Sequence, residues 1–333
     1  MNRQFPAASV VMAVHNGGSL LKTSVESALA QTFGAFELIL VDDGSTDGCV
    51  DAVRNLDPRI VCVEQPNQGA SSATQTGLLR ARAPLIAFLD QDDLWSPGKL
   101  AAQVGILDRD PSIVLTFSAT AYIGPSGELL PLPRRVWDGP VDFETLMCDF
   151  VIGNTSSVAL RRQTALAAGG CDPSFRFMYD LDLFLRISLA HGAGILGDSS
   201  QWTYYRRHES QMSRRLHEMT AEWNRLLAKM GALSPDRFRS CEAAARRNMN
   251  RYFAYLAYET GVPLRGLRML ASELFRSPAG WIRDRRNWLV TAACFARATL
   301  PEQVVRRFGG YSRSSFKTTP RRRAPWPGGR SKM

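Results

Sequence analysis

The stretch PLIAFLDQDDLW, residues 84–95, passes from an apolar segment typical of a buried β-strand directly into three carboxylates, Asp90, Asp92 and Asp93. Like charges this close together repel one another, so the pattern predicts a guest that relieves the repulsion, either a cation or a polyanion held through a cation. Asp residues also end strands and cap helices in many proteins, so the triplet alone is weak support for a metal site.

Strand and helix signals alternate through the first 90 residues. The expected strands are ASVVMAV (8–14), FELILVDDGS (36–45), RIVCVEQ (59–65) and PLIAFLD (84–90), and the expected helices are SLLKTSVESALAQTF (19–33), TDGCVDAVRNL (46–56) and ASSATQTGLLRA (70–81). This alternation, with continuously apolar strands, predicts an α/β fold: a Rossmann-like mixed, mostly parallel sheet flanked by helices. Such sheets bind ligands at the carboxyl ends of their strands, which is where Asp43 and Asp90 both stand.

Strand signals stop after about residue 210, and four helical segments follow. They are AEWNRLLAKM (221–230), SCEAAARRNMNRYFAYLAYET (240–260), LRGLRMLASELF (264–275) and WIRDRRNWLVTAACFARATL (281–300), with apolar residues at three- and four-residue spacing. We therefore expect an α/β domain over residues 1–210 and an α-helical C-terminal region over 211–312. The last segment, 313–333, is basic and has no periodicity, so we expect a disordered tail.

Charge also divides the chain. Residues 1–200 carry 14 basic and 22 acidic side chains, a net charge of −8, whereas residues 201–333 carry 27 basic and 9 acidic ones, a net charge of +18. This asymmetry indicates two modules with different partners. The six cysteines are scattered without a CxxC pair, which favours reduced thiols in a cytosolic protein over a disulfide framework or a zinc site.

Several common classes of protein lack support in this sequence. No run of 18 or more apolar residues predicts a membrane span, and the N-terminal apolar run is too short for a signal peptide. Neither GxGxxG nor GxxxxGK[ST] follows a strand, so dinucleotide-binding and P-loop proteins lose their main signature. The expected location is the cytoplasm.

Eight motifs in order carry a resemblance to a known family. They are VVMAVHN (10–16), VESALAQTF (25–33), FELILVDDGSTD (36–47), NQGASSATQTG (67–77), IAFLDQDDLW (86–95), NTSSVALRR (154–162), GGCDPSF (169–175) and YDLDLFLR (179–186). Over roughly residues 7–210 the chain resembles the family 2 glycosyltransferases in the order and spacing of these motifs. The resemblance implies a GT-A-like catalytic domain and an enzyme that moves a sugar from a nucleotide diphosphate donor to an acceptor hydroxyl.

The resemblance also implies a donor site. Ala13 and His15 would border the base, and Asp43 would accept a hydrogen bond from the ring N–H of uracil or thymine, which a carboxylate does well. Asp90 would lie near the ribose, and Asp92 would ligate Mn²⁺ or Mg²⁺ at the diphosphate. Such an ion neutralises the charge that develops on the leaving group. The expected donor is a UDP- or dTDP-sugar.

Three residues further along complete the implied site. The family pattern places its general base at Asp180, which would take the acceptor's proton in a single displacement with inversion at the anomeric carbon. Asp182 is the alternative base, or a group that binds substrate or orients a neighbour, and both acids also suit the start of a helix. His208 would ligate the metal or touch a phosphate, although a solvated basic loop explains it equally well.

The chain departs from the family pattern at two places. The family often carries Arg and Asn where this chain has Thr74 and Gln75, so a contact to the phosphates or the base is missing or is supplied elsewhere. The family also tends to have an acidic residue just before its base, where this chain has Tyr179. We expect that change to alter the pKa of the base or the acceptor site.

The basic C-terminal half suggests a further partner. Within the segment 281–300, one stripe carries Trp281, Trp288, Ala292 and Phe295, and Arg residues lie beside it. This pattern suits an anionic membrane surface as well as a helix packed on the catalytic domain. We expect no nucleic acid partner, because the Arg residues are spread through core-forming helices and no recognition motif is present.

The combined prediction is an inverting glycosyltransferase of cell-surface polysaccharide or glycolipid synthesis. Its acceptor would be a saccharide or a lipid-linked saccharide, and its C-terminal helices would contact the inner membrane face peripherally. Two rival functions stay open at this point. One is a nucleotidyltransferase of similar fold, and the other is a sugar-nucleotide-binding protein whose catalysis is impaired.

Overall fold

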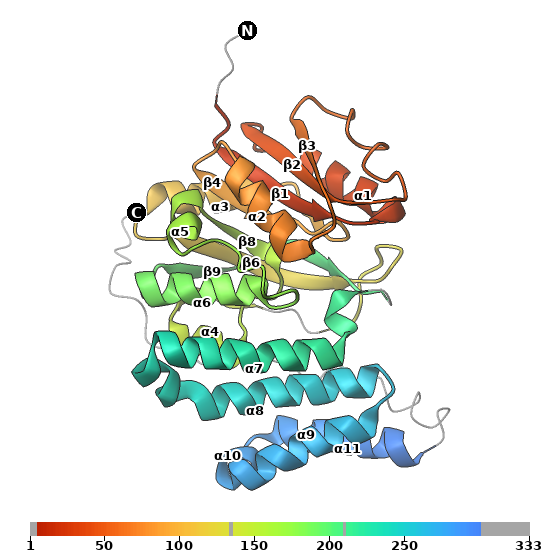
Figure 1. Ribbon diagram of the computed structural model, residues 1–333, viewed down its shortest axis with the longest axis vertical. Helices are drawn as coiled ribbons and strands as arrows, with labels where there is room; N and C mark the ends of the chain where they lie inside the picture. Colours follow the sequence, from red (N-terminus) through yellow and green to blue (C-terminus); the bar gives the residue numbers. More distant parts are fainter. Residues whose placement is uncertain (1–4, 133–135, 209–210, 301–333) are drawn as a thin grey trace, which may run out of the picture.

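A computed structural model describes residues 5–132, 136–208 and 211–300. Figure 1 shows a sheet with its covering helices at one end of the molecule and layers of helices at the other. The strands are β1 (Ala8–Val14), β2 (Phe36–Asp43), β3 (Ile60–Gln65), β4 (Leu85–Phe88), β5 (Leu94–Trp95), β6 (Leu115–Ile123), β7 (Gly139–Val141), β8 (Val158–Arg161) and β9 (Ile195–Arg206). The helices beside them are α1 (Gly18–Leu29), α2 (Ala70–Arg80), α3 (Lys99–Arg109), α4 (Phe143–Asp149), α5 (Arg162–Ala167) and α6 (Tyr179–His191), with a 3₁₀ turn η1 (Thr155–Ser157).

These strands form one mixed sheet, which confirms the predicted fold class. The order is β3-β2-β1-β4-β8-β6-β9-β5, and β7 also pairs with β9. Strands β1 to β4 pair in parallel, as expected, because the connections through α1 and α2 are long enough to cross over. From β4 onward the pairing alternates: β8 is antiparallel to β4 and β6, whereas β9 is parallel to β6. Parallel pairing therefore dominates in the first half of the sheet only.

The central strands are apolar along their whole length because both faces of the sheet are covered. Along β1, Val10 and Met12 face one hydrophobic core, and Val11 between them faces the other. This alternation follows from the two-residue period of a strand. It leaves the strand ends as the place where polar side chains gather.

The short helix predicted over residues 46–56 is wrong. The segment forms a series of turns instead. Within it the Asp47 side chain accepts a hydrogen bond from the backbone N–H of Cys49 at 3.1 Å, and just before it Asp42 accepts one from Ser45 at 2.8 Å. Such local bonds compete with helix formation, which explains the failure of the prediction.

The C-terminal region is helical, as predicted. Its helices are α7 (Leu216–Leu233), α8 (Pro235–Glu259), α9 (Pro263–Arg276), α10 (Pro278–Arg283) and α11 (Arg285–Thr299), after a 3₁₀ turn η2 (Met212–Arg214). Figure 1 shows α7 next to the sheet domain, α8 beyond it, and α9 to α11 as the outermost layer. No helix within the described ranges is both long and apolar enough to cross a membrane. The predicted tail, 313–333, lies outside the described residues.

The helical region does not have one hydrophobic core that is separate from the core of the sheet domain. Trp223 and Leu226 of α7 belong to the same core as Ile39 of β2 and Leu183 of α6. A smaller core, which includes Leu270, joins α8 to the outer helices. Helix α7 is therefore packed as part of the sheet domain, whereas α9 to α11 rest on α8.

The prediction of a single helix over residues 281–300 is wrong, because the helix is interrupted at Asp284. The Asp284 carboxylate accepts a hydrogen bond from the backbone N–H of Arg286 at 3.0 Å and so caps α11. It also forms an ion pair of 2.8 Å with the buried Arg251 of α8. The break divides the predicted apolar stripe: Trp281 is buried in the small core, whereas Trp288 is exposed.

Candidate active site

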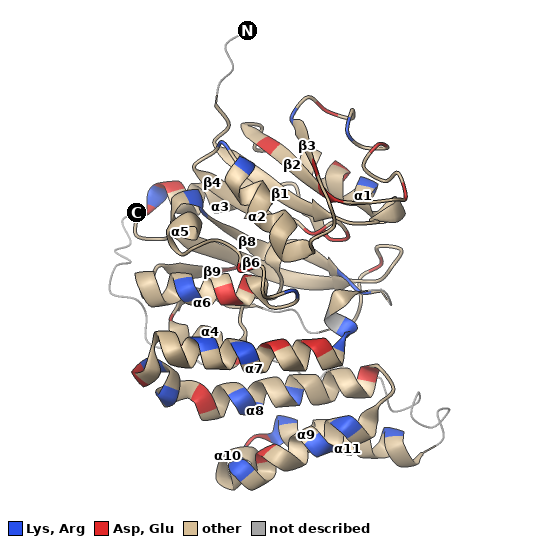
Figure 2. Cartoon of the chain, viewed as in Figure 1, with Lys and Arg blue, Asp and Glu red and all other residues tan. Residues whose placement is uncertain are grey.

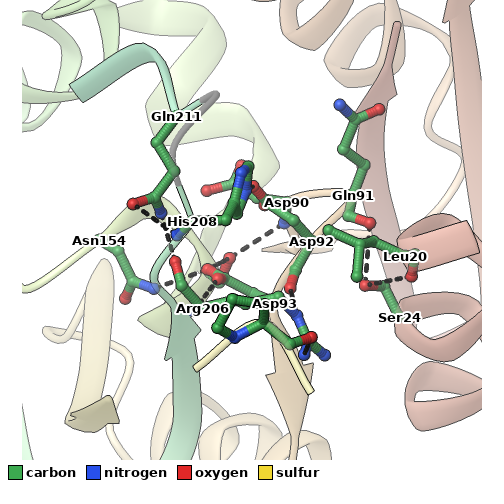
Figure 3. A network of polar contacts seen from close by, with 12 residues as sticks. Leu20, Ser24, Asp90, Gln91, Asp92, Asp93, Asn154, Arg206, His208 and Gln211 are labelled. Atoms are coloured by element: carbon green, nitrogen blue, oxygen red, sulfur yellow. Dashed lines mark hydrogen bonds and ion pairs between the residues drawn. The ribbon is translucent and has the colours of Figure 1, made fainter. Parts of the chain in front are cut away.

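The loop after β4 holds the three carboxylates that the sequence crowds together, and Figure 3 shows them in one polar network. Asp93 is fully buried and accepts hydrogen bonds from Asn154 Nδ2 (2.8 Å), Ser156 Oγ (2.6 Å) and the backbone N–H of Arg206 (2.9 Å). Burial, together with the two neighbouring Asp side chains, raises the pKa of Asp93 well above its usual value. Asp93 therefore anchors the loop. Its place beside two other carboxylates is explained by this structural role.

Asp92 points instead toward the loop after β9. His208 Nε2 lies 2.8 Å from Asp92 Oδ2, although the two residues are 116 positions apart in the sequence. Arg206 ties the loops together because its Nε donates to the Asp92 carbonyl at 2.7 Å. Gln211 Nε2 donates to the Arg206 carbonyl, and Gln211 Oε1 accepts from the His208 N–H at 3.3 Å. The structure thus brings together the two residues expected to ligate a metal.

The donor set at Asp92 and His208 suits a divalent ion that a substrate helps to bind. Asp92 and His208 would hold such an ion through a carboxylate oxygen and an imidazole nitrogen, and the ion would supply charge neutralisation at a phosphate group. Among the described residues, no group of three or more His, Cys, Asp or Glu side chains forms a complete metal site. Further ligands would have to come from phosphate oxygens or water, as is usual in nucleotide sites.

Asp90 lies between the metal-ligand pair and the predicted base. Its backbone N–H donates to Ser156 Oγ at 2.9 Å, which fixes the start of the loop. Burial raises the pKa of Asp90 to about 7, with contributions from the carboxylates of Asp92 and Asp180. The crowding of negative charge predicted from the sequence is therefore real, and it involves Asp180 as well.

Asp180 stands in the first turn of α6, at the edge of this network. Its Oδ2 accepts from Thr155 Oγ1 at 2.8 Å and its Oδ1 from the Leu181 N–H at 2.7 Å. Burial raises the pKa of this carboxyl, which makes it a better proton acceptor near neutral pH. Thr155 belongs to η1, the same turn that supplies Ser156 to the loop after β4. The motif NTSS therefore links the acidic loop to Asp180, a role that the sequence did not reveal.

Asp182 does not share this environment. It is fully buried and accepts hydrogen bonds from Arg186 Nε (2.9 Å) and Nη2 (2.6 Å). Lys229 Nζ of α7 lies 2.7 Å from its other oxygen. With both oxygens paired to cations, Asp182 is placed to orient its neighbours, and these contacts do not favour the expected contact with substrate.

A second polar cluster lies at the ends of β1 and β2. Ala13 is partly exposed there, and His15 Nδ1 lies 2.9 Å from the Asp43 carbonyl. The Asp43 carboxylate is buried and accepts hydrogen bonds from Gln65 Nε2 (2.7 Å) and from the backbone N–H groups of Gln68 (2.8 Å) and Gly69 (2.7 Å). It holds the turn that leads into α2 and keeps one of about four acceptor positions for a ligand.

The two clusters are connected. The backbone N–H of His15 donates to Gln91 Oε1 at 2.9 Å, and Gln91 sits in the acidic loop between Asp90 and Asp92. The predicted base-binding residues and the predicted metal ligands thus line one continuous edge of the sheet.

The departures from the family pattern also meet in space. The Tyr179 side chain lies beside that of Thr74, and both residues are buried. Beside them, Gln75 Oε1 accepts from the backbone N–H of Cys171 at 2.8 Å. Helix α2 therefore holds the segment that leads to Asp180 through neutral side chains, at the positions where the family often has Arg and Asn.

Comparison with known proteins agrees with this geometry. The family model described as glycosyl transferase family 2 matches residues 9–163. A teichuronic acid biosynthesis glycosyltransferase, TuaG of Bacillus subtilis, named as putative, is 29% identical over 55% of this chain and 72% of its own length. WfaP of Escherichia coli, a UDP-Glc:α-D-GlcNAc-diphosphoundecaprenol β-1,3-glucosyltransferase, is 36% identical over 31% of this chain and 41% of its own length.

A solved structure extends the likeness in fold. The crystal structure of S. aureus TarS 1–349 in complex with UDP-GlcNAc matches with a TM-score of 0.60 and 15% identity, over 92% of each chain. The match covers less than half of WfaP, so the chain is similar to one part of that protein and not to the whole of it. The chain matches glycosyl transferase family 2 over residues 9–163, and it is a glycosyltransferase with a GT-A-like fold.

Proposed function

We propose that this glycosyltransferase moves a sugar from a UDP- or dTDP-linked donor to an acceptor hydroxyl, with inversion at the anomeric carbon. The observation that carries the proposal is the single network that contains both the Asp92–His208 pair and Asp180. A leaving-group site and a base within one network are what a single displacement requires. The match of residues 9–163 to a glycosyltransferase family model speaks against the rival nucleotidyltransferase.

The donor would lie along the edge of the sheet. Ala13, His15 and Asp43 would border its base, with the remaining acceptor position of Asp43 facing the ring N–H. Asp90 would lie near the ribose. Asp92 and His208 would hold Mn²⁺ or Mg²⁺ at the diphosphate, and this ion would supply electrostatic stabilisation of the leaving group.

The transfer itself would use Asp180. Its carboxylate accepts the proton of the acceptor hydroxyl while the acceptor oxygen bonds to the anomeric carbon and the bond from that carbon to the phosphate oxygen breaks. The electron pair of the broken bond leaves with the nucleoside diphosphate, so no covalent intermediate with the enzyme is needed. Thr155 fixes the orientation of the carboxylate through its hydrogen bond to Oδ2.

The acceptor would be a saccharide, free or carried on a lipid, in cell-surface polysaccharide or glycolipid synthesis. The names of WfaP and TuaG support this class of acceptor. A thermal-shift panel of nucleotide sugars, with and without Mn²⁺, tests the donor proposal. We expect one UDP- or dTDP-sugar to raise the melting temperature only when Mn²⁺ is present. Equal stabilisation without metal, or by none of the donors, contradicts it.

The outer helices would bring the enzyme to the membrane that holds a lipid-linked acceptor. Their exposed large apolar side chains, which we call the outer apolar set, are Leu264, Phe275, Ile282, Trp288, Leu289 and Phe295. Residues 262–300 also carry seven Arg, no Lys and two acidic residues, and Figure 2 shows Arg along α9 to α11. Apolar side chains mixed with Arg suit the surface of an anionic bilayer, which is the partner we propose.

A further inference from the structure

We propose that helix α7 positions the base of the catalytic site, because its Glu222 holds the start of the helix that carries Asp180. Glu222 would be a positioning residue, which acts on the reaction through Asp180 and does not touch the substrate. The inference rests on the proposed role of Asp180 as the base. It assigns a catalytic task to the helical region, which the family model does not cover.

Glu222 holds the segment that enters α6, up to its N-cap residue, from outside that helix. Its Oε1 accepts from the backbone N–H of Arg176 at 2.7 Å, and its Oε2 accepts from those of Phe177 (2.7 Å) and Met178 (3.1 Å). Met178 is the N-cap residue of α6, and its own side chain makes no capping hydrogen bond. N–H groups at a helix start lack partners within the helix, and a carboxylate there also interacts favourably with the helix dipole.

The Glu222 carboxylate is committed to this task. Its side chain is 7% exposed, and Arg225 of the same helix lies 3.3 Å from Oε1. A buried carboxylate costs free energy unless it is hydrogen-bonded, and here three backbone donors satisfy it. Sequence alone does not show this, because a Glu in an amphipathic helix is usually exposed to water.

Lys229 makes a second connection from the same face of α7, seven residues or about two turns further along. Its Nζ lies 2.7 Å from Asp172 Oδ2 and 2.7 Å from Asp182 Oδ1. The segment from Asp172 to Asp182 is therefore held by α7 at both ends and next to Asp180. Because Asp182 also pairs with Arg186, the first turn of α6 is fixed by charges from two helices.

The position of Asp180 depends on these contacts. Its carboxylate has to face Thr155 and the acceptor at the same time, and a shift of about 1 Å in a catalytic group can cost about 10²-fold in rate. Glu222→Gln removes the charge and one of the two acceptor oxygens, so at least one backbone N–H loses its partner. We expect the start of α6 to move while the donor site on the sheet stays in place.

The test compares Glu222→Gln with Glu144→Gln in the full-length protein. Glu144 of α4 pairs with Arg237 of α8 at 2.7 Å, so it also joins the helical region to the sheet domain, but within the described residues no hydrogen bond or ion pair joins it to α6. The readout is release of UDP or dTDP from the nucleotide sugar that stabilises the protein, together with the donor dissociation constant and the melting temperature.

We expect Glu222→Gln to lower kcat about 10- to 100-fold with the donor dissociation constant within twofold of the wild type. Glu144→Gln should leave kcat within twofold. If Glu222→Gln does not fold, Lys229→Gln should lower kcat in the same direction and Lys229→Arg should restore it. A wild-type kcat in Glu222→Gln, or in both Lys229 variants, overturns the inference.

The result also separates this inference from the proposed function. If Asp180→Asn keeps wild-type kcat, Asp180 is not the base and the proposed mechanism fails first. If Asp180→Asn loses turnover while Glu222→Gln keeps it, only the role of α7 is wrong.

Discussion

The sheet domain and the helical C-terminal region carry opposite net charges and suit different kinds of ligand. The sheet domain gathers several carboxylates at the strand ends, where hydrogen bonds from Asn154, Ser156 and Arg206 hold Asp93 in place. The helical region carries a large excess of Arg and leaves several apolar side chains in water. The first arrangement suits a small charged ligand, and the second suits a broad surface.

The comparison also shows where the functional boundary lies. By sequence, α7 belongs to the helical C-terminal region. It nevertheless shares the core of the sheet domain and contacts the segment around Asp180 through Glu222 and Lys229. The fully buried side chains of helices α9 to α11, such as Leu270 and Val290, lie in the small core on α8. The packing therefore assigns α7 to the catalytic domain and leaves the outer helices available to bind a partner.

The largest expected effect belongs to the sheet domain. Asp180→Asn should lower kcat by about 10²- to 10⁴-fold, because the amide cannot take the acceptor's proton. The donor dissociation constant, measured by calorimetry, should stay within about twofold. Asp236→Asn is the matched control, because Asp236 also lies in the first turn of its helix but is exposed to water. Comparable turnover in both variants would remove Asp180 from the mechanism.

An intermediate effect is expected at the outer helices. Trp288→Ser with Phe295→Ser should lower binding to vesicles of anionic phospholipid by at least about tenfold, since each buried aromatic side chain contributes about 1.5–3 kcal/mol. Co-sedimentation with the vesicles gives the partition coefficient, and turnover on a soluble acceptor should be unchanged. Leu79→Ser in α2 is the control, because Leu79 is also exposed but lies in the sheet domain.

Three outcomes would remove the membrane proposal. The wild-type protein fails to bind the vesicles, it binds neutral vesicles equally well, or the Leu79 control loses as much binding as the double variant. A dimer that dissociates in the double variant would assign the outer apolar set to a second copy of the chain.

The smallest effect concerns the pair that replaces the usual family residues. Tyr179→Phe should lower the free energy of unfolding by about 1 kcal/mol, because the buried Thr74 hydroxyl loses the polar group beside it. Thr74→Val should cost a similar amount, and the double variant should cost less than the sum. Denaturant unfolding of the three variants measures this coupling. Strict additivity would show that the two side chains do not interact.

Much of the fold follows from local sequence pattern. The strand β1 and the helix α2 lie where apolar periodicity and turn residues predict them, because both elements bury a regular face. The predictions fail at 46–56 and at Asp284, where an Asp side chain bonds to nearby backbone. Side-chain capping of this kind leaves no signal in hydrophobic periodicity.

The site shows a similar limit. Asp92 and His208 were expected to serve one ion, and the structure brings them into contact. The sequence does not indicate that Thr155 and Glu222 hold the site, since their hydrogen bonds join elements far apart in the chain. A polar residue that supports a site looks in sequence like one that faces water.

The most direct test of the account is the position of Mn²⁺ in crystals grown with UDP, found from its anomalous scattering. The account predicts a single strong peak within bonding distance of both Asp92 and His208 Nε2, next to the diphosphate and on the side of the network that faces Asp180. UDP bound at the strand edge with no peak at Asp92, or a peak held by other residues, would contradict it.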